Sequence, residues 1–374
     1  MTEIIPFRAV RYNKKNISDL ICPPYDIISP SEKTGYLKKN PENAVRIEYP
    51  SNYHVAKKNF ELWRVKKVLI KDLSPSFYIY EQSFTFKEKK YIRSGFFALL
   101  KTEKFGKNIF PHEKTHIAPK LDRLNLLKIT NINTSPIFCL FSDKKEIFRK
   151  IVLKIKKKKP LAFASLPNGK EKMWKISDKK IIKALEYLLK NNKILIADGH
   201  HRYETFFEFT KGGYILTFLC PFEDKGLLIL PTHRLIKNWT EKETKKIYHF
   251  FEFSKKWDFK FYIKNKYFYL KVPQKYRGLP IQYLHSTMLK NKEINYTKDE
   301  KEAIREVNSG KFAAAVIVKP LTIEDLKSVV NKKIVLPQKS TYFYPKVSTG
   351  FVFNQMHANK KRNANKNSRQ LALD

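Results

Sequence analysis

Apolar and polar positions follow two different periods along this chain. Apolar residues at alternate positions predict strands over residues 77–86 and 91–100, joined by a polar turn. Apolar residues three or four positions apart predict amphipathic helices over residues 54–70 and 178–189. Because strands and helices follow one another in mixed order, we expect an α/β protein of the mixed α+β type.

Several shorter segments add to this outline. Ser29 and Glu32, with a proline between them, have the spacing of a helix start. We expect 214–220 and 226–230 to be adjacent buried strands, and 312–318 to be a central strand because it is apolar throughout. Further strands are predicted over residues 45–49, 173–176, 194–197 and 259–270.

The length of the chain, 374 residues, indicates two lobes. A basic run at residues 154–159 marks the expected boundary between them. We therefore predict an N-terminal mixed α/β lobe over residues 1–150 and a second lobe over residues 151–353. Residues 354–374 contain few large apolar side chains and are expected to form a disordered basic tail.

The predicted strand at residues 194–197 leads into a turn that is rich in hydrogen-bond donors. Asp198 and Gly199 end the strand, and a helix is expected from Tyr203 onward. Glycine lets a ligand approach the backbone closely, and the exposed N–H groups at the start of a helix favour an anion. These features predict a phosphate-binding turn between a buried strand and a helix.

The side chains of this turn support the same interpretation. His200, His201 and Arg202 add donors, and a guanidinium matches the oxygens of a phosphate. His201 and Glu204 are candidates for catalysis. A polar turn in which Asp198 only caps the helix is the alternative. The residues assigned to nucleotide binding in the turn are Asp198, Gly199, His200, Arg202 and Tyr203.

A second polar cluster, at residues 112–116, matches the zinc-protease pattern H-E-x-x-H by letter. That chemistry requires both histidines on one face of a helix. Pro111 and Pro119 leave barely two turns, and no third ligand follows at a suitable distance. We therefore expect no zinc. His112 and Glu113 are predicted instead to act in catalysis.

A third polar cluster lies at residues 336–346, where Lys339, Ser340 and Thr341 stand beside aromatic residues. These three are assigned to nucleotide binding, and an aromatic edge strand with solvated lysines is the alternative. Asp26 either faces a cleft or caps a turn. Weaker candidates for substrate binding are Lys120, Asp122, Arg123, Thr232, His233 and Arg234. For the first three of them, a solvated helix face is the alternative.

Several motifs occur in one order and together resemble domain of unknown function 1015, a family often described as ParB-like. They are PFRAVRYN at Pro6, PPYDIIS at Pro23, NPENAVRIE at Asn40, PHEKT at Pro111, KLDRL at Lys120, SPIF at Ser135, ADGHHRYET at Ala197, LPTHRL at Leu230 and LPQKSTYFYPK at Leu336. The wider ParB and sulfiredoxin group is similar in placing a short turn on nucleotide phosphates. It includes a free-serine kinase with a comparable Asp-Gly-His-His-Arg run.

The resemblance implies a ParB/sulfiredoxin-like lobe built around the turn, and an activity of nucleotide-dependent phosphoryl transfer. Such chemistry consists mostly of positioning and charge stabilisation. The cofactor would be ATP or ADP with Mg²⁺, and Glu113 or Glu204 would act as general base or hold the metal. Serine or phosphoserine is the best guess for the small-molecule substrate. The alternatives are a nucleotide-binding, DNA-associated regulator and a phosphatase or nuclease that uses the same histidines.

A net charge of +40 invites a nucleic-acid interpretation. The 75 basic residues are 62 Lys and 13 Arg, however, and the lysines are spread through every segment. A/T-rich codons explain this composition without a polyanion, so nucleic acid is not expected as the main partner. An Arg then marks a place that needs a guanidinium. Such arginines lie in the motif segments at 8, 46, 93, 123, 202 and 234.

Cysteine usage and hydropathy bear on the compartment. Three widely separated Cys predict a reducing compartment without disulfides. The start of the chain has no secretory pattern, and no apolar run is long enough to span a bilayer. We therefore expect a cytoplasmic protein that does not enter a membrane; its oligomeric state is left open.

Overall fold

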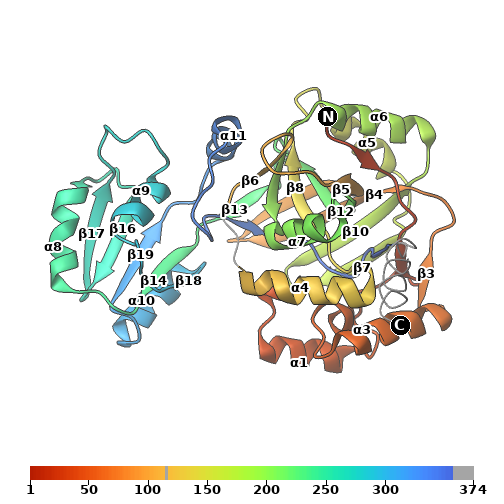
Figure 1. Cartoon of the computed structure of the whole chain (residues 1–374), viewed down its shortest axis with the longest axis horizontal. Coiled ribbons are helices and arrows are strands. Elements are labelled where there is room, and N and C mark those ends of the chain that lie inside the picture. Colours follow the sequence, from red (N-terminus) through yellow and green to blue (C-terminus); the bar gives the residue numbers. More distant parts are fainter. Residues whose placement is uncertain (114–116, 357–374) are drawn as a thin grey trace, which may run out of the picture.

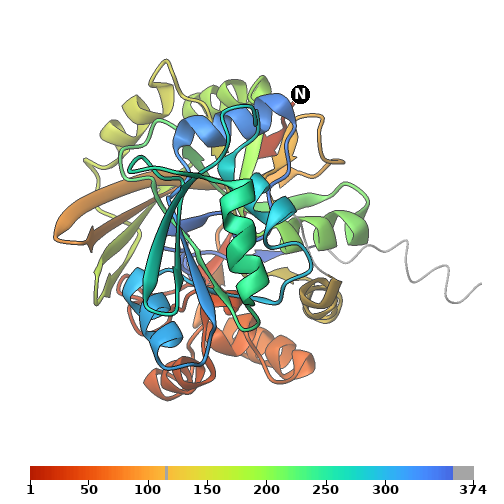
Figure 2. The ribbon, with the colours of Figure 1, turned by 90° about the vertical axis from the view of Figure 1, so that its left-hand side faces the viewer.

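A computed structural model describes residues 1–113 and 117–356 of the chain, with residues 117–119 described by their backbone alone. It contains a larger and a smaller lobe, each built around its own sheet (Figure 1). Figure 2 views the molecule with the smaller lobe in front. Helices and strands both contribute to each lobe, which confirms the mixed α/β class.

The larger lobe contains a nine-stranded sheet. Eight strands follow the order β6-β11-β8-β12-β5-β4-β10-β9, and β1 pairs with β5. Because these strands lie on both sides of residue 150, the predicted lobe boundary falls inside one sheet. The strands are β1 (Ile4–Ile5), β4 (Phe77–Phe86), β5 (Lys89–Lys101), β6 (Ile109–Pro111), β8 (Ile137–Phe141), β9 (Ala162–Leu166), β10 (Gly169–Ile176), β11 (Ile194–Asp198) and β12 (Tyr214–Pro221).

The smaller lobe is an insertion into the larger one. The chain leaves the larger lobe after β13 (Leu228–Leu230) and returns at β20 (Tyr342–Tyr344), and these two strands pair antiparallel. Between them lies a six-stranded sheet of order β15-β17-β16-β19-β14-β18. Its strands are β14 (His233–Ile236), β15 (Glu252–Phe253), β16 (Phe259–Ile263), β17 (Lys266–Lys271), β18 (Ile294–Thr297) and β19 (Ala314–Val318).

Helices cover both faces of the large sheet, because its strands alternate buried side chains between two cores. Tyr78 and Tyr80 of β4 point into one core, and Phe77 and Ile79 point into the other. Helices α2 (Val45–Glu48), α3 (Tyr53–Val65) and α11 (Ile323–Lys332) contribute to the first core. Helices α4 (Ile117–Thr130), α5 (Ile147–Ile155), α6 (Lys179–Lys190) and α7 (His200–Thr210) contribute to the second.

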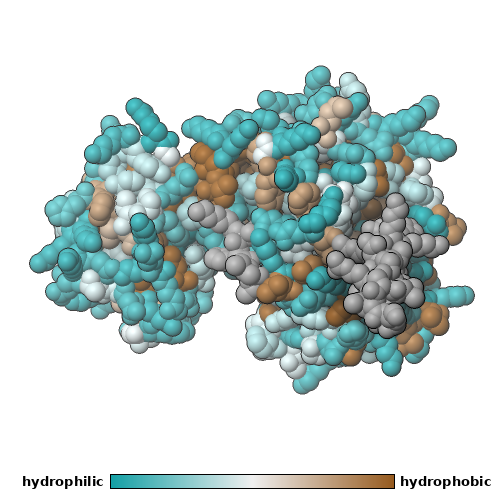
Figure 3. Space-filling model, in the orientation of Figure 1, coloured by the Kyte–Doolittle hydropathy of each residue, from teal (hydrophilic) through white to brown (hydrophobic). Residues whose placement is uncertain are grey.

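The remaining elements complete the two lobes. In the larger lobe they are β2 (Val10–Tyr12), β3 (Leu69–Lys71), β7 (Ile132–Asn133), β21 (Asn354–Gln355), α1 (Pro30–Lys39) and the short 3₁₀ helix η1 (Tyr25–Ile27). In the smaller lobe they are α8 (Glu241–Phe250), α9 (Pro280–Thr287) and α10 (Glu300–Asn308). Hydrophilic side chains cover most of both lobes in the view of Figure 3, and hydrophobic residues gather only in small patches. Among the described residues, no helix is long and apolar enough to cross a bilayer.

Most strongly patterned segments were predicted correctly. The strands β4 and β5, the helices α3 and α6, and the Ser29–Glu32 capping box of α1 are all present. β19 is a central strand, as its apolar sequence predicted. The two strands expected to be adjacent, β12 and β13, lie in different sheets, because β13 pairs with the distant β20.

Two further local predictions need correction. Residues 45–49 form the helical turn α2 instead of a strand, with Val45 and Ile47 fully buried. The expected tail does not begin at residue 354, because Asn354 and Gln355 form β21 and pair with β7. Residues 357–374 lie outside the described residues.

A line of aromatic rings joins the returning chain to the large sheet. The ring of Phe138 in β8 lies 5.2 Å from that of Phe218 in β12 and 5.4 Å from that of Phe343 in β20. All three side chains are buried. They fix β20, and with it the polar segment that precedes it, against the centre of the larger lobe.

Replacing Phe138 by alanine should destabilise the protein strongly. Loss of a buried phenylalanine typically costs about 3–5 kcal/mol, because transfer free energy and cavity formation add. Tyr187→Ala is the control, because that ring is 73% exposed and its loss should change stability by no more than about 0.5 kcal/mol. Urea denaturation measures both, and equal effects would contradict the packing described.

Candidate anion-binding site at the β11–α7 turn

The predicted strand–turn–helix is present. Strand β11 is buried between β6 and β8, and Gly199 is the residue that caps α7. The helix begins at His200, three residues earlier than predicted. Gly199 has a φ of 90°, and a Cβ there would lie 2.9 Å from Cγ2 of Ile137. Only glycine fits both the backbone conformation and the space.

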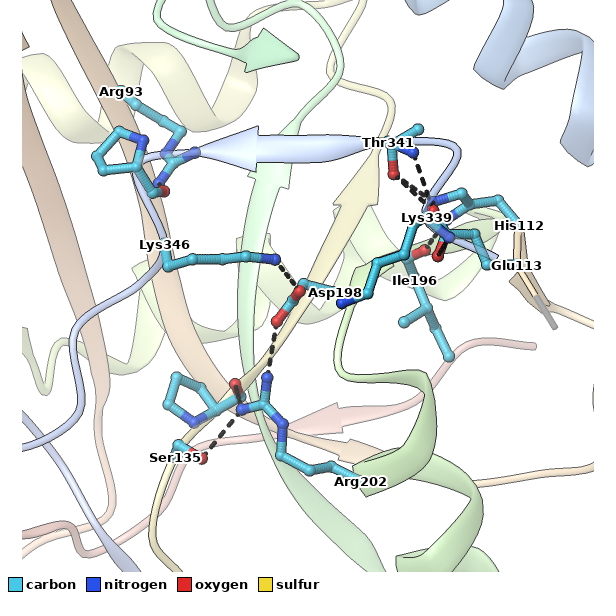
Figure 4. A network of polar contacts seen from close by, with 12 residues as sticks. Arg93, His112, Glu113, Ser135, Ile196, Asp198, Arg202, Lys339, Thr341 and Lys346 are labelled. Atoms are coloured by element: carbon cyan, nitrogen blue, oxygen red, sulfur yellow. Dashed lines mark hydrogen bonds and ion pairs between the residues drawn. The ribbon is translucent and has the colours of Figure 1, made fainter. Parts of the chain in front are cut away.

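Asp198, at the end of β11, joins two cations (Figure 4). One carboxylate oxygen contacts the ammonium of Lys346, and the other accepts a hydrogen bond of 2.7 Å from Arg202. Burial alone raises the pKa of Asp198, but the charges of Lys346 and Arg202 outweigh burial and lower the pKa to about 2. Asp198 is therefore a permanent anion that ties three separate segments together.

The guanidinium of Arg202 is held by the protein itself. Besides Asp198, its Nη1 donates to the Ser135 hydroxyl at 3.0 Å and to the Pro136 carbonyl at 2.6 Å. We predicted that the guanidinium of Arg202 would be open to phosphate oxygens. Its Nη1 and Nη2 atoms, however, already donate to acceptors in the protein. Arg202 lines the site and fixes the start of β8 against the turn.

His112 is fully buried and bridges β11 to the returning chain. Its Nδ1 donates to the Ile196 carbonyl at 2.6 Å, and its Nε2 lies 2.6 Å from the Thr341 hydroxyl. The His112 backbone N–H donates to Nε2 of His200 at 3.3 Å. Burial, followed by the neighbouring His112, lowers the pKa of His200 to about 3, so its ring is neutral at physiological pH.

The Glu113 carboxylate holds the loop that follows the smaller lobe. It accepts hydrogen bonds from the backbone N–H of Lys339 at 3.0 Å and of Thr341 at 2.9 Å. Burial alone raises the pKa of Glu113, but the hydrogen bond with His112 and the nearby His200 reverse this and hold the pKa far below its usual range. An acid this strong is a poor proton acceptor, although we predicted Glu113 as a general base.

A cavity of about 390 Å³ opens at the turn, and we call it the turn cavity. It brings together residues from all three predicted polar clusters. Lys339 extends across it toward Asp198 in Figure 4. Its lining residues are Tyr25, Asp26, Glu113, Asp198, Gly199, His200, His201, Arg202, Gln338 and Lys339.

Two residues at the turn were missed or left open by the sequence. Asp26, which was expected either to face a cleft or to cap a turn, is exposed and lines the turn cavity. Lys346, bound to Asp198, lies 148 positions away in sequence, so no local pattern could pair them. The PPYD and YFYPK motifs that contain them were the available signal.

Several predicted residues lie away from the turn cavity. Glu204 forms an ion pair with Lys120 between α7 and α4. Tyr203 is buried, and its hydroxyl bonds the backbone of Glu103. The Ser340 hydroxyl donates to the Pro337 carbonyl at 2.5 Å. Within the described part of the chain, the turn cavity is not lined by Lys120, Tyr203, Glu204 or Ser340.

Two of the substrate candidates, Asp122 and Arg123, lie on α4. Arg123 lies 3.8 Å from the centre of the Tyr25 ring, which lines the turn cavity, and donates to the Glu48 carbonyl. Asp122 accepts a 2.7 Å hydrogen bond from the Tyr53 hydroxyl.

The other three candidates belong to the segment that opens the smaller lobe. Thr232 is buried, and Val318 N–H donates to His233. Arg234 is fully buried and donates to the Lys339 carbonyl at 3.3 Å. It therefore supports the site from the smaller lobe.

Side chains that commonly bind metals do not cluster in the described part of the chain. Within residues 1–113 and 117–356, no three His, Cys, Asp or Glu side chains are placed to hold an ion. All three cysteines are free and buried. His116, the second histidine of the H-E-x-x-H pattern, lies outside the described residues.

Fold and site together define a two-lobed mixed α/β protein with a polar cavity at a strand–helix turn. The chain belongs to the family described as "Protein of unknown function (DUF1015)", whose model matches residues 4–298. This confirms the resemblance to domain of unknown function 1015; the likeness to the ParB and sulfiredoxin group stays an expectation. No curated protein matches the chain.

Solved structures show only remote likeness. A conserved hypothetical protein from Pyrococcus furiosus is 14% identical with a TM-score of 0.39, over 66% of this chain and 94% of that one. A free serine kinase in complex with AMP is 12% identical with a TM-score of 0.40, over 67% and 94%. SbnI with a C-terminal truncation, from Staphylococcus aureus, is 8% identical with a TM-score of 0.45, over 74% and 95%.

The protein should become less stable as the pH drops through a range that is set by the pKa of His200. The folded pKa is about 3 against an ordinary 6.5, so between these values the unfolded chain binds a proton that the folded protein does not. His200 therefore destabilises the fold as pH falls from 6.5 toward 3, by up to about 1.4 kcal/mol per pH unit.

Urea denaturation between pH 6.5 and 4.5 should show a shallower slope for His200→Gln than for the wild type. Glutamine still offers an oxygen to the His112 N–H. His54→Gln, at an exposed position on α3, should keep the wild-type slope. Identical slopes for wild type and His200→Gln would contradict a neutral buried His200.

Proposed function

We propose that the protein catalyses nucleotide-dependent phosphoryl transfer to a small molecule that carries a hydroxyl group. One observation carries this proposal: the turn cavity combines the start of α7 with an exposed cation, Lys339, and an exposed carboxylate, Asp26. These are the parts that position phosphates and accept the proton of a hydroxyl.

The start of α7 supplies the anion-binding element. Its capping residue, Gly199, has no side chain, so the cap itself supplies no side-chain acceptor to the first turn of the helix. Those groups carry the positive end of the helix dipole, and they favour phosphate oxygens. The left-handed backbone at Gly199 turns the chain sharply into the helix beside the cavity.

Two lysines reach the same place from the returning chain. Lys339 is exposed and lines the turn cavity, while Lys346 contacts Asp198 at its edge. A nucleotide phosphate bound at α7 would be bracketed by the two ammonium groups. Lysine acts on phosphate as a point charge, and negative charge that spreads over the transferred group is stabilised by such fixed cations.

Asp26 is the carboxylate best placed to accept the hydroxyl proton. Within the described residues, no hydrogen bond or ion pair occupies its oxygens. Glu113 is engaged by backbone N–H groups and Glu204 by Lys120, which leaves Asp26 as the available base. Because Asp198 is paired with Lys346 and Arg202, a Mg²⁺ ion would be held mainly by the nucleotide phosphates and water.

Serine is the acceptor to test first, with phosphoserine as the product of the transfer, because the Asp198–Arg202 run resembles that of a free-serine kinase. The cavity wall gives the acceptor a polar surface with both charge signs, from Asp26 and Lys339. Such a surface suits a zwitterion better than an apolar alcohol.

Removing the charge of Lys339 should weaken nucleotide binding. Charge-assisted hydrogen bonds contribute about 1.5–3 kcal/mol, so Lys339→Met should lower the affinity for ADP roughly 10- to 100-fold. Lys333→Met is a matched control, because Lys333 is also exposed and has a φ of 52° against 56° for Lys339. Calorimetry with ADP and Mg²⁺ measures both, and equal affinities would place the phosphate elsewhere.

Replacing Asp26 by asparagine should lower turnover and leave nucleotide affinity within about threefold. Loss of a general base typically costs 10²- to 10⁴-fold in rate. Phosphorus NMR of ATP mixed with serine, Mg²⁺ and protein follows the product directly. Asp19→Asn, another exposed carboxylate, serves as the control. Unchanged turnover in Asp26→Asn would assign the base to another residue.

A further inference from the structure

We infer that a second cavity, beside the turn cavity, takes the nucleoside end of the nucleotide. It has a volume of about 430 Å³ and lies between α1, the β9–β10 hairpin and β20. We call it the tyrosine cavity, after Tyr36, Tyr342 and Tyr344 in its wall. The inference rests on the proposed function and adds to it where each end of the nucleotide binds.

The two cavities share a wall. Lys346 lines the tyrosine cavity, and its ammonium contacts Asp198, which lines the turn cavity. On the other side, the three residues of η1 divide between them: Tyr25 and Asp26 line the turn cavity, and Ile27 lines the tyrosine cavity. A ligand with two chemically different ends can therefore occupy both, with Lys346 at the junction.

The walls of the tyrosine cavity fit a flat ring. Phe84 and Tyr344 lie with ring centroids 5.6 Å apart at one end, and Tyr36 and Leu166 add apolar surface. Every nucleobase has a π-face, and stacking of a base on an aromatic side chain is worth about 1–3 kcal/mol. Cavities of this size with mostly apolar walls and a few polar groups are typical ligand sites.

The polar groups of the tyrosine cavity are held in fixed positions. Glu171 is 3% exposed and accepts hydrogen bonds from Gln82 at 2.7 Å and from the Ser348 hydroxyl at 3.0 Å. Gln82 in turn accepts from the buried Arg93. A preorganised polar floor beneath apolar walls suits a heterocycle with ring nitrogens and ribose hydroxyls.

The opposite assignment fits the chemistry less well. The phosphates need the start of α7 and Lys339. Both line the turn cavity and neither lines the tyrosine cavity. The acceptor hydroxyl must reach Asp26, which lines the turn cavity as well. Only the nucleoside end of the nucleotide remains to be placed in the tyrosine cavity. The aromatic rings in the wall of that cavity suit a nucleobase.

The test fills the tyrosine cavity with a larger side chain. It then compares a ligand that carries both nucleoside and phosphates with one that carries phosphates alone. Leu166→Trp places a larger side chain at its wall, and Leu73→Trp makes the same change where the leucine is 90% exposed. Calorimetry with ADP and with inorganic tripolyphosphate, both with Mg²⁺, separates the two ends. Leu166→Trp should bind ADP at least 10-fold more weakly and tripolyphosphate within twofold of the wild type. Leu73→Trp should bind both normally.

A second variant keeps the test decisive if the larger side chain disturbs folding. Tyr36→Leu removes a half-buried ring from a helix and retains a good helix former. It should weaken binding of ADP and of adenosine by a similar factor and leave tripolyphosphate unaffected.

The outcomes separate this inference from the proposed function. Wild-type ADP affinity in both Leu166→Trp and Tyr36→Leu, while Lys339→Met still weakens ADP, would overturn the nucleoside assignment alone. Failure of the wild-type protein to bind ADP at all would overturn the proposed function, and this inference with it.

Discussion

The returning chain, residues 336–346, must take one fixed position against the larger lobe, and buried charge sets that position. Glu113 accepts the N–H groups of Lys339 and Thr341, and Asp198 contacts Lys346. At the far end, Arg93 donates to the carbonyls of Tyr344 and Pro345. A buried charge without its partner costs several kcal/mol. A shifted alignment of this segment would remove a partner from all three charges, so the contacts favour a single arrangement.

The scarce arginines were informative, although not in the way we expected. We took an Arg in a lysine-rich chain to mark a position that needs a guanidinium; Arg93, Arg123 and Arg234 are buried, and the Arg202 side chain is only 11% exposed. Their donors reach backbone carbonyls or protein carboxylates. The planar fork can satisfy several acceptors at once in a dry interior, where a lysine would leave acceptors unpaired. Rarity of a residue type therefore indicated structural need, and the ligand contacts that we propose are made by lysines.

Local patterns were enough to predict β4, β5, α6 and the turn after β11, because each depends on neighbours in sequence. The division into lobes was not predictable in this way. It depends on the pairing of β13 with β20, which are separated in sequence by the whole inserted segment 231–341. Likewise, Glu113 resembled a catalytic base in sequence, whereas its bonding partner Lys339 lies 226 positions further along. Type and spacing identified the polar clusters; their roles depend on contacts between clusters.

The position of Lys339 connects the two lobes to the chemistry proposed for the turn cavity. Its backbone N–H is held by Glu113 of the larger lobe, and its carbonyl accepts from Arg234 of the smaller lobe. Arg234 is buried beside Tyr296, and burial lowers its pKa to about 10, so it remains charged. A displacement of the smaller lobe by even one ångström would stretch one of these two bonds. The ammonium that faces α7 is thus placed by both lobes together, and neither lobe alone can form the complete site.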